Sequence, residues 1–171
     1  MQEKTGPTRL IRAKTPESVG VSTKALAKFI EEMEELEIEC HSLMVLRDGK
    51  VAYEAYADPL GPGIPHVMYS VSKSFTATAI GFAVEEGLLT LETKVLDIFP
   101  EYKPEKEDPY LEKLNIFHLL TMTAGKDVPT LSDKARDTWT EDFFAAKWAF
   151  EPGTFFRYVS ENTYILSAAI S

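Results

Sequence analysis

Residues that bind metals or form disulfides are scarce in this sequence. Cys40 is the only cysteine among 171 residues, so no internal disulfide can form, and a reducing compartment fits this composition. The three histidines, His41, His66 and His118, are scattered, with no HExxH motif and no pair at i and i+4. Zinc-binding sequences usually show such spacings. We therefore expect no metal site and no cofactor.

The sequence has few basic residues and no long apolar segment. The chain carries 27 acidic and 18 basic residues, a net charge of −9, with no run of Lys or Arg interleaved with aromatics. A nucleic-acid partner is therefore not expected. No stretch of eighteen apolar residues occurs, and residues 1–14 contain no apolar leader. We expect no membrane association and a cytoplasmic location.

The first third of the chain predicts a helix followed by a β-hairpin. With 44% hydrophobic and 11% aromatic residues, the chain can bury a sizeable core. Ser22 is a good N-cap, and apolar residues at helical spacing predict a helix over 23–37 whose acidic face is solvated. Apolar strands at 41–47 and 51–56 flank Asp48 and Gly49, a strong hairpin signal.

The remainder of the chain is mostly helical in pattern. Apolar and small residues predict a buried helix over 71–86, with Gly87 as its stop. A short helix should precede Pro100, and the final apolar segment ends without a cap, which favours a domain that continues further. Three further helices are predicted over residues 115–124, 140–149 and 163–171. A polar loop at 127–137 separates the first two, and a turn at Pro152 and Gly153 separates the last two.

Ser70 and Lys73 carry the chemistry that the sequence suggests. Spaced by three residues, they share one face of a helix, so the amine can reach the hydroxyl. The SxxK pattern alone is weak, because ten serines and thirteen lysines predict about 0.8 such pairs by chance. The glycine- and proline-rich loop before Ser70 places it near a helix N-terminus. The alternative is that Lys73 lies at a surface edge and extends into water.

Four ordered motifs resemble the serine β-lactamase-related family, which includes class C β-lactamases, DD-peptidases, related esterases and nylon-oligomer hydrolases. The resemblance runs from about Pro16 to the end of the chain. The motifs are Met68–Ala77, Gly87–Leu89 with Asp97 following, Leu119–Gly125, and Pro152–Thr154 leading to Tyr158.

The resemblance implies an α/β (α+β) class and a β-lactamase/transpeptidase-like fold. In that fold an antiparallel sheet flanked by helices is combined with a mostly helical domain. Residues 1–60 would form the start of the α/β domain, and residues 61–171 the mostly helical domain with the SxxK helix. The remaining strands of the α/β domain would lie in sequence that this chain does not contain.

The resemblance also implies roles for three residues. Ser70 matches the acylated nucleophile, Lys73 the amine that takes its proton, and Tyr158 the phenol that relays protons to the leaving group. Whether Lys73 or Tyr158 is the base stays open. The alternative for Tyr158 is a core tyrosine packed in an aromatic cluster with Phe155 and Phe156.

Two departures from the family pattern bear on activity. The sequence Tyr158-x-Ser160-x-Asn162-Thr163 looks more like the esterase and amide-hydrolase branch, with Ser160 and Asn162 as candidate substrate-binding residues. The family's third motif, a Lys or His followed by Thr or Ser and Gly, does not occur after residue 160. In the family, this motif lies on a strand that also supplies one hydrogen-bond donor of the oxyanion hole. The resemblance therefore implies that these 171 residues alone are nearly inactive.

Two functions are therefore compatible with the sequence. In the first, the protein is a serine hydrolase that acts through an acyl-enzyme on Ser70, with a small-molecule or peptide substrate that carries an ester or amide. In the second, it is a catalytically silent relative that binds penicillin-like ligands or peptidoglycan. The presence of Ser70, Lys73 and Tyr158 together favours the first. The oligomeric state is left open by the sequence.

Overall fold

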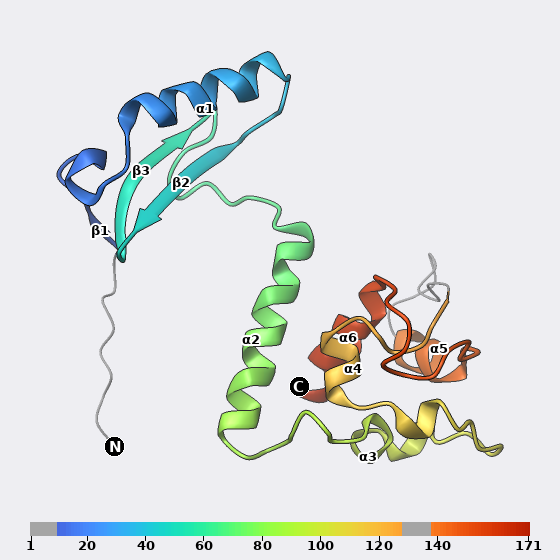
Figure 1. Ribbon diagram of the computed structural model, residues 1–171. Helices are drawn as coiled ribbons and strands as arrows, with labels where there is room; N and C mark the ends of the chain where they lie inside the picture. Colours follow the sequence, from blue (N-terminus) through green and yellow to red (C-terminus); the bar gives the residue numbers. More distant parts are fainter. Residues whose placement is uncertain (1–9, 128–137) are drawn as a thin grey trace. The chain divides into compact units, whose positions relative to one another are not determined.

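The computed structural model describes residues 10–127 and 138–171, which divide into two compact units after Val67. The sequence placed this boundary after residue 60. The first unit holds a helix and a small sheet, and the second is helical (Figure 1). Each unit is described separately below.

In the first unit, helix and hairpin form where the sequence predicts them. Helix α1 spans Thr23–Glu35 and is capped by the Ser22 hydroxyl, which accepts from the Ala25 N–H. Strands β2 (Ser42–Arg47) and β3 (Lys50–Tyr56) pair antiparallel. Asp48 and Gly49 both have positive φ, which is the conformation that a tight hairpin turn requires.

A third strand was missed by the sequence analysis. Strand β1, Ile11–Arg12, pairs parallel with β3, so the sheet order is β1-β3-β2 and the sheet is mixed (Figure 1). Two residues are too few to show the alternation that identifies a strand. A 3₁₀ turn at Pro16–Val19, which begins with a capping box at Thr15, leads from this strand toward α1.

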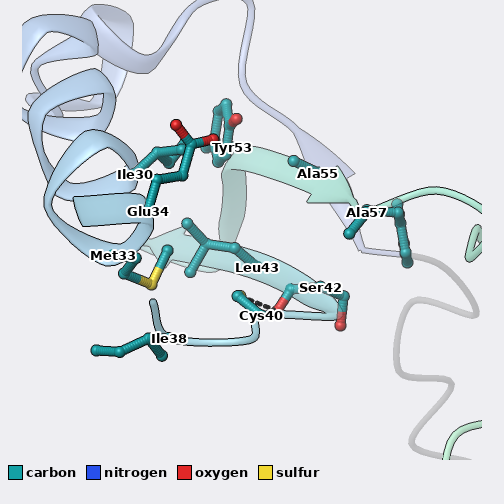
Figure 2. A pocket seen from close by; sticks show the side chains of 11 residues that line it. Ile30, Met33, Glu34, Ile38, Cys40, Ser42, Leu43, Tyr53, Ala55 and Ala57 are labelled. Atoms are coloured by element: carbon teal, nitrogen blue, oxygen red, sulfur yellow. Dashed lines mark hydrogen bonds between the residues drawn. The ribbon is translucent and has the colours of Figure 1, made fainter. Parts of the chain in front are cut away.

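An apolar hollow lies between α1 and the hairpin. Figure 2 shows Ile30 and Met33 of α1 and Leu43 and Tyr53 of the strands lining it. The Cys40 thiol lies at its edge and donates a hydrogen bond of 3.4 Å to the Ser42 carbonyl (Figure 2). The hollow is therefore lined by packing residues of this unit.

The second unit is built from helices around one core. It contains α2 (Ser72–Glu85), α3 (Val95–Ile98), α4 (Ile116–Leu120), α5 (Trp139–Ala145) and α6 (Ser160–Ala169), with 3₁₀ turns at Tyr69–Val71, Pro100–Tyr102 and Leu111–Lys113. Helix α6 packs against α2, α4 and α5. Most of the core is apolar, and its most completely buried apolar side chains are Ile80, Val95, Leu111, Leu114, Ile116, Leu119, Phe143, Ile165 and Leu166.

The prediction that the SxxK helix is buried is wrong for this chain. Ile80 and Ala83 of α2 are buried, whereas Phe75 is 67% and Phe82 60% exposed. The apolar residues of α2 lie all around the helix, while the neighbouring helices of this unit cover one side of it. Apolar content alone therefore overstated the burial.

Three predicted helix boundaries also need correction. Helix α4 stops at Leu120 instead of residue 124, because Met122 adopts a left-handed φ of 58° that a continuous helix excludes. Helix α5 ends at Ala145, and α6 begins at Ser160. Most of the predicted 127–137 loop lies outside the described residues.

No helix in the described ranges has the length and apolar content needed to cross a bilayer. The expected cytoplasmic location stays a prediction.

Helix α4 begins with a reciprocal cap that depends on a neutral histidine. The Asn115 side chain accepts from the His118 N–H at 3.0 Å, and His118 Nδ1 accepts from the Asn115 N–H at 3.4 Å. Partial burial, and then the positive charge of Lys94, lower the pKa of His118. The contribution of this cap is therefore fully present above the ordinary histidine pKa of 6.5 and is lost as the pH falls through the folded pKa.

We predict that His118→Ala lowers the free energy of unfolding by about 0.5–1.5 kcal/mol at pH 8, the net value of one hydrogen bond, and by less at pH 5. Urea unfolding at both pH values measures the difference. The matched control is Asn115→Ala, which removes the other half of the cap and should cost about 1 kcal/mol at either pH. A His118→Ala effect of equal size at both pH values would contradict the proposed dependence.

Candidate active site

Ser70 lies in a 3₁₀ turn that leads directly into helix α2. The turn covers Tyr69–Val71, and the Val71 N–H donates to the Met68 carbonyl at 3.0 Å. Tyr69 has a φ of 43°, in the left-handed region. A non-glycine residue in that region costs roughly 1–3 kcal/mol, and such residues cluster at functional sites. The strained residue is the immediate neighbour of the predicted nucleophile.

Lys73 lies in the first turn of α2 on the same face as Ser70. Its Nζ donates a hydrogen bond of 3.0 Å to Ser70 Oγ. This is the contact that i and i+3 spacing on a helix allows. The alternative, in which Lys73 only extends into water from a surface edge, does not describe this geometry.

Tyr158 reaches the same oxygen from a distant part of the sequence. Its hydroxyl donates to Ser70 Oγ at 2.7 Å, across 88 positions of the chain. The Lys73 Nζ lies 5.3 Å from the centroid of the Tyr158 ring. The structure therefore brings all three predicted catalytic residues together around one hydroxyl oxygen, and their catalytic roles remain to be tested.

This cluster lowers the pKa of Tyr158. The largest cause is hydrogen bonding with Ser70, followed by a contribution of the same sign from Lys73, while slight desolvation acts in the opposite direction. After the phenol loses its proton, Ser70 becomes the donor to the phenolate and stabilises it. The ring is half exposed, so water screens part of this effect.

The alternative interpretation of Tyr158, as a core tyrosine, is wrong. Its side chain is 52% exposed, and Phe156 is also exposed. Phe155 instead stacks on Phe150, with ring centroids 4.2 Å apart. The expected cluster of Tyr158 with Phe155 and Phe156 therefore does not form.

The backbone around Tyr158 is held by the segment that follows α4. The Arg157 N–H donates to the Met122 carbonyl at 2.9 Å, and the Gly153 N–H donates to the Thr123 carbonyl at 2.8 Å. Val159, on the other side of Tyr158, is buried. Sequence analysis missed the anchoring role of Met122, although its position in the Leu119–Gly125 motif was a signal.

The two predicted substrate-binding residues occupy different environments. Ser160 is the exposed first residue of α6. Asn162 is fully buried, its amide nitrogen donates to the Met122 sulfur at 3.6 Å, and its Oδ1 has no hydrogen-bond partner among the described residues. In this chain Asn162 therefore contacts the Met122 segment, and substrate binding by either residue stays a prediction.

Among residues 10–127 and 138–171, no group of three or more His, Cys, Asp or Glu side chains is arranged to hold a metal ion.

Comparison with known proteins identifies the family of this chain. The Beta-lactamase family profile matches residues 26–171. A β-lactamase of Pseudomonas fluorescens is 29% identical over 131 residues, which are 71% of this chain and 36% of that protein. A 6-aminohexanoate-dimer hydrolase of Paenarthrobacter ureafaciens is 34% identical over 131 residues, which are 75% of this chain and 32% of that protein.

The fold agrees with solved structures of the same kind. The β-lactamase/D-alanine carboxypeptidase of Pseudomonas syringae superposes with a TM-score of 0.67 at 25% identity, over 85% of this chain and 42% of that one. The predicted β-lactamase-like fold class is thereby confirmed. The chain spans about a third of the length of the curated relatives that it matches. Because the family profile covers most of its residues, the chain belongs to the β-lactamase family of hydrolases.

Proposed function

We propose that this protein is a serine hydrolase that forms an acyl-enzyme through Ser70 with ester, amide or peptide substrates. The observation that supports this proposal most directly is the pair of hydrogen bonds that Ser70 Oγ accepts, from Lys73 at 3.0 Å and from Tyr158 at 2.7 Å. A serine hydroxyl is a weak nucleophile until a neighbouring base removes its proton. Two groups that can exchange protons with Ser70 are within hydrogen-bonding distance.

Tyr158 is the base in this proposal. Lys73 and Tyr158 both donate to Ser70 Oγ, so one of them must lose a proton before it can accept one. Hydrogen bonding with Ser70 lowers the pKa of Tyr158, which favours the phenolate. The Lys73 ammonium, 5.3 Å from the ring centroid, stabilises the resulting negative charge.

The reaction then proceeds in two halves. As the Tyr158 phenolate takes the Ser70 proton, Oγ bonds to the substrate carbonyl carbon and the carbonyl electron pair moves to oxygen. The tetrahedral intermediate collapses, the bond to the leaving group breaks, and that group takes the proton from Tyr158. Water attacks the acyl-enzyme by the same sequence of steps, which releases the acid and restores Ser70. Backbone N–H groups near the start of α2 favour the developing oxyanion.

Amides and esters are the proposed substrates. The pattern Tyr158-x-Ser160-x-Asn162 resembles the esterase and amide-hydrolase branch more than efficient β-lactamases. The relative that is 34% identical bears the name of a 6-aminohexanoate-dimer hydrolase.

Labelling with a fluorophosphonate tests the nucleophile directly. We expect one covalent adduct on Ser70 by mass spectrometry, since labelling needs a single event per molecule and detects even a slow nucleophile. The matched control is Ser72→Ala, which removes a nearby hydroxyl that donates to the Tyr69 carbonyl. Absence of an adduct, or an adduct that survives in Ser70→Ala, would exclude Ser70 as the nucleophile and leave a non-catalytic ligand-binding protein.

Substitution of Tyr158 tests the base. Tyr158→Phe should slow labelling about a hundredfold to ten-thousandfold, the usual contribution of general-base catalysis. The wild-type rate should rise with pH, with a midpoint below the ordinary tyrosine value of 10.0, because the phenolate is the reactive form. Tyr164→Phe is a suitable control, since it removes a phenol that hydrogen-bonds Thr140. An unchanged pH profile in Tyr158→Phe would assign the base elsewhere.

Substrate preference is tested by turnover. We expect hydrolysis of a p-nitrophenyl ester to exceed that of a chromogenic β-lactam, with both rates abolished in Ser70→Ala. Equal or faster turnover of the β-lactam, measured by initial rates at matched concentrations, would contradict the esterase or amidase assignment.

A further inference from the structure

Asn162, in the first turn of α6, is a polar residue with 0% of its surface exposed. Its side-chain Nδ2 donates to the Met122 sulfur at 3.6 Å, and its Oδ1 has no hydrogen-bond partner among the described residues. A buried amide oxygen without a hydrogen bond destabilises a fold, and leucine would fill nearly the same volume without that penalty. Filling the core therefore does not explain an amide at this position.

The contact between Asn162 and Met122 gains importance from its burial. Methionine sulfur is a weak hydrogen-bond acceptor. Around Asn162, however, no water competes for the amide N–H, because the residue is completely enclosed. Loss of the sulfur would leave that donor unpaired in an apolar environment, where unpaired polar groups are most costly. The Asn162 amide is therefore directed toward Met122.

Met122 also has a strained backbone, with a φ of 58° in the left-handed region. Such strain persists only where surrounding contacts enforce it, and it clusters at functional sites. Two contacts of Met122 go to the segment that carries Tyr158. Its carbonyl accepts from the Arg157 N–H at 2.9 Å, and its sulfur accepts from Asn162. Tyr158 lies between these two attachments in the chain.

The backbone that carries Met122 is itself closely held. The Gly125 carbonyl accepts from the Phe150 N–H at 3.0 Å. A Cβ at position 125 would lie 2.2 Å from the Phe150 carbonyl oxygen, so the two segments approach as closely as glycine allows. Met122, three residues before Gly125, is therefore a fixed point to which the start of α6 can be attached.

Tyr158 has few side-chain contacts that restrain it. Its ring is 52% exposed, and the neighbouring Arg157 is exposed too. Tyr158 lies two residues before α6, so a shift of the first turn of that helix would move its hydroxyl from its place 2.7 Å from Ser70 Oγ. Proton transfer is sensitive to such shifts. Attachment of Asn162 to Met122 restricts this movement.

We propose that Asn162 is a positioning residue for Tyr158: its hydrogen bond to Met122 fixes the first turn of α6 and so keeps the Tyr158 hydroxyl on Ser70 Oγ. The proposal rests on the serine-hydrolase function proposed above. Asn162 does not touch substrate in this role, since its side chain is enclosed. Its loss should therefore slow the chemical step and leave substrate affinity unchanged, whereas loss of a substrate-binding residue would lower affinity.

The experiment compares Asn162→Leu, which removes the donor, with Met122→Leu, which removes the acceptor, and with the double variant. Each protein carries 3-fluorotyrosine at position 158, and its ¹⁹F resonance is followed through a pH titration. Fluorophosphonate labelling of Ser70 gives the maximal rate and the probe concentration at half that rate. The matched control is Ile165→Val, which trims another fully buried residue of α6. Thermal unfolding establishes that each variant is folded.

We expect each single variant to raise the pKa of residue 158, because the Ser70 hydrogen bond that lowers it is weakened. The maximal labelling rate should fall roughly threefold to tenfold, as weakening of one hydrogen bond would produce. The half-saturating probe concentration should not change. The double variant should be no slower than the slower single variant, because both substitutions remove the same contact. Ile165→Val should lower the thermal midpoint and change none of the other values.

Four results would overturn the proposal. The first is a folded Asn162→Leu protein with an unchanged residue 158 titration. The second is a raised half-saturating probe concentration at an unchanged maximal rate, which would assign Asn162 to substrate binding. The third is additive effects of the two substitutions, or an equal effect of Ile165→Val, which would indicate general packing of α6. The fourth is failure of both single variants to fold, which would show a role in stability alone.

The two proposals fail in different ways. If wild-type protein does not label at Ser70, the hydrolase function is lost, whereas the ¹⁹F titration still reports the contact between Tyr158 and Ser70. If labelling occurs but residue 158 titrates identically in all variants, the hydrolase function stands and the positioning role is excluded.

Discussion

The hydrogen bond from Tyr158 to Ser70 Oγ joins parts of the chain 88 positions apart, and the arrangement of the helical unit determines whether it forms. Lys73 reaches Ser70 through helix geometry alone, because both residues lie on one face of the same turn. Tyr158 has no such local route. It depends on the packing of α6 against α2 and α4 and on the backbone contact between Arg157 and Met122.

This difference explains how much of the site was predictable. The Ser70 and Lys73 contact follows from spacing, and the hairpin follows from Asp48 and Gly49, because both features are local. Tyr158 was assigned through the family resemblance, because without it the neighbouring Phe155 and Phe156 favoured a core tyrosine. The contribution of Met122 escaped notice because it comes from a backbone carbonyl, and the burial of Lys126 escaped notice because a sequence pattern does not display which charged residues are enclosed.

Burial was the least predictable property of the fold. An apolar helix such as α2 shows which residues can be buried, but the neighbouring segments determine which ones are. Phe75 and Phe82 are exposed in this unit, while Lys126 and Glu161 are enclosed by it. The chain spans about a third of the length of its curated relatives.

The two lysines of the helical unit illustrate opposite uses of the same side chain. Lys73 is only half buried and directs its amine at Ser70, where it can stabilise a phenolate on Tyr158. Lys126 is 2% exposed and lies against the rings of Phe143 and Trp148, and this burial lowers its pKa to about 8. The Tyr158 ring is half exposed, so its position beside Ser70 depends on the backbone contact between Arg157 and Met122 more than on side-chain packing.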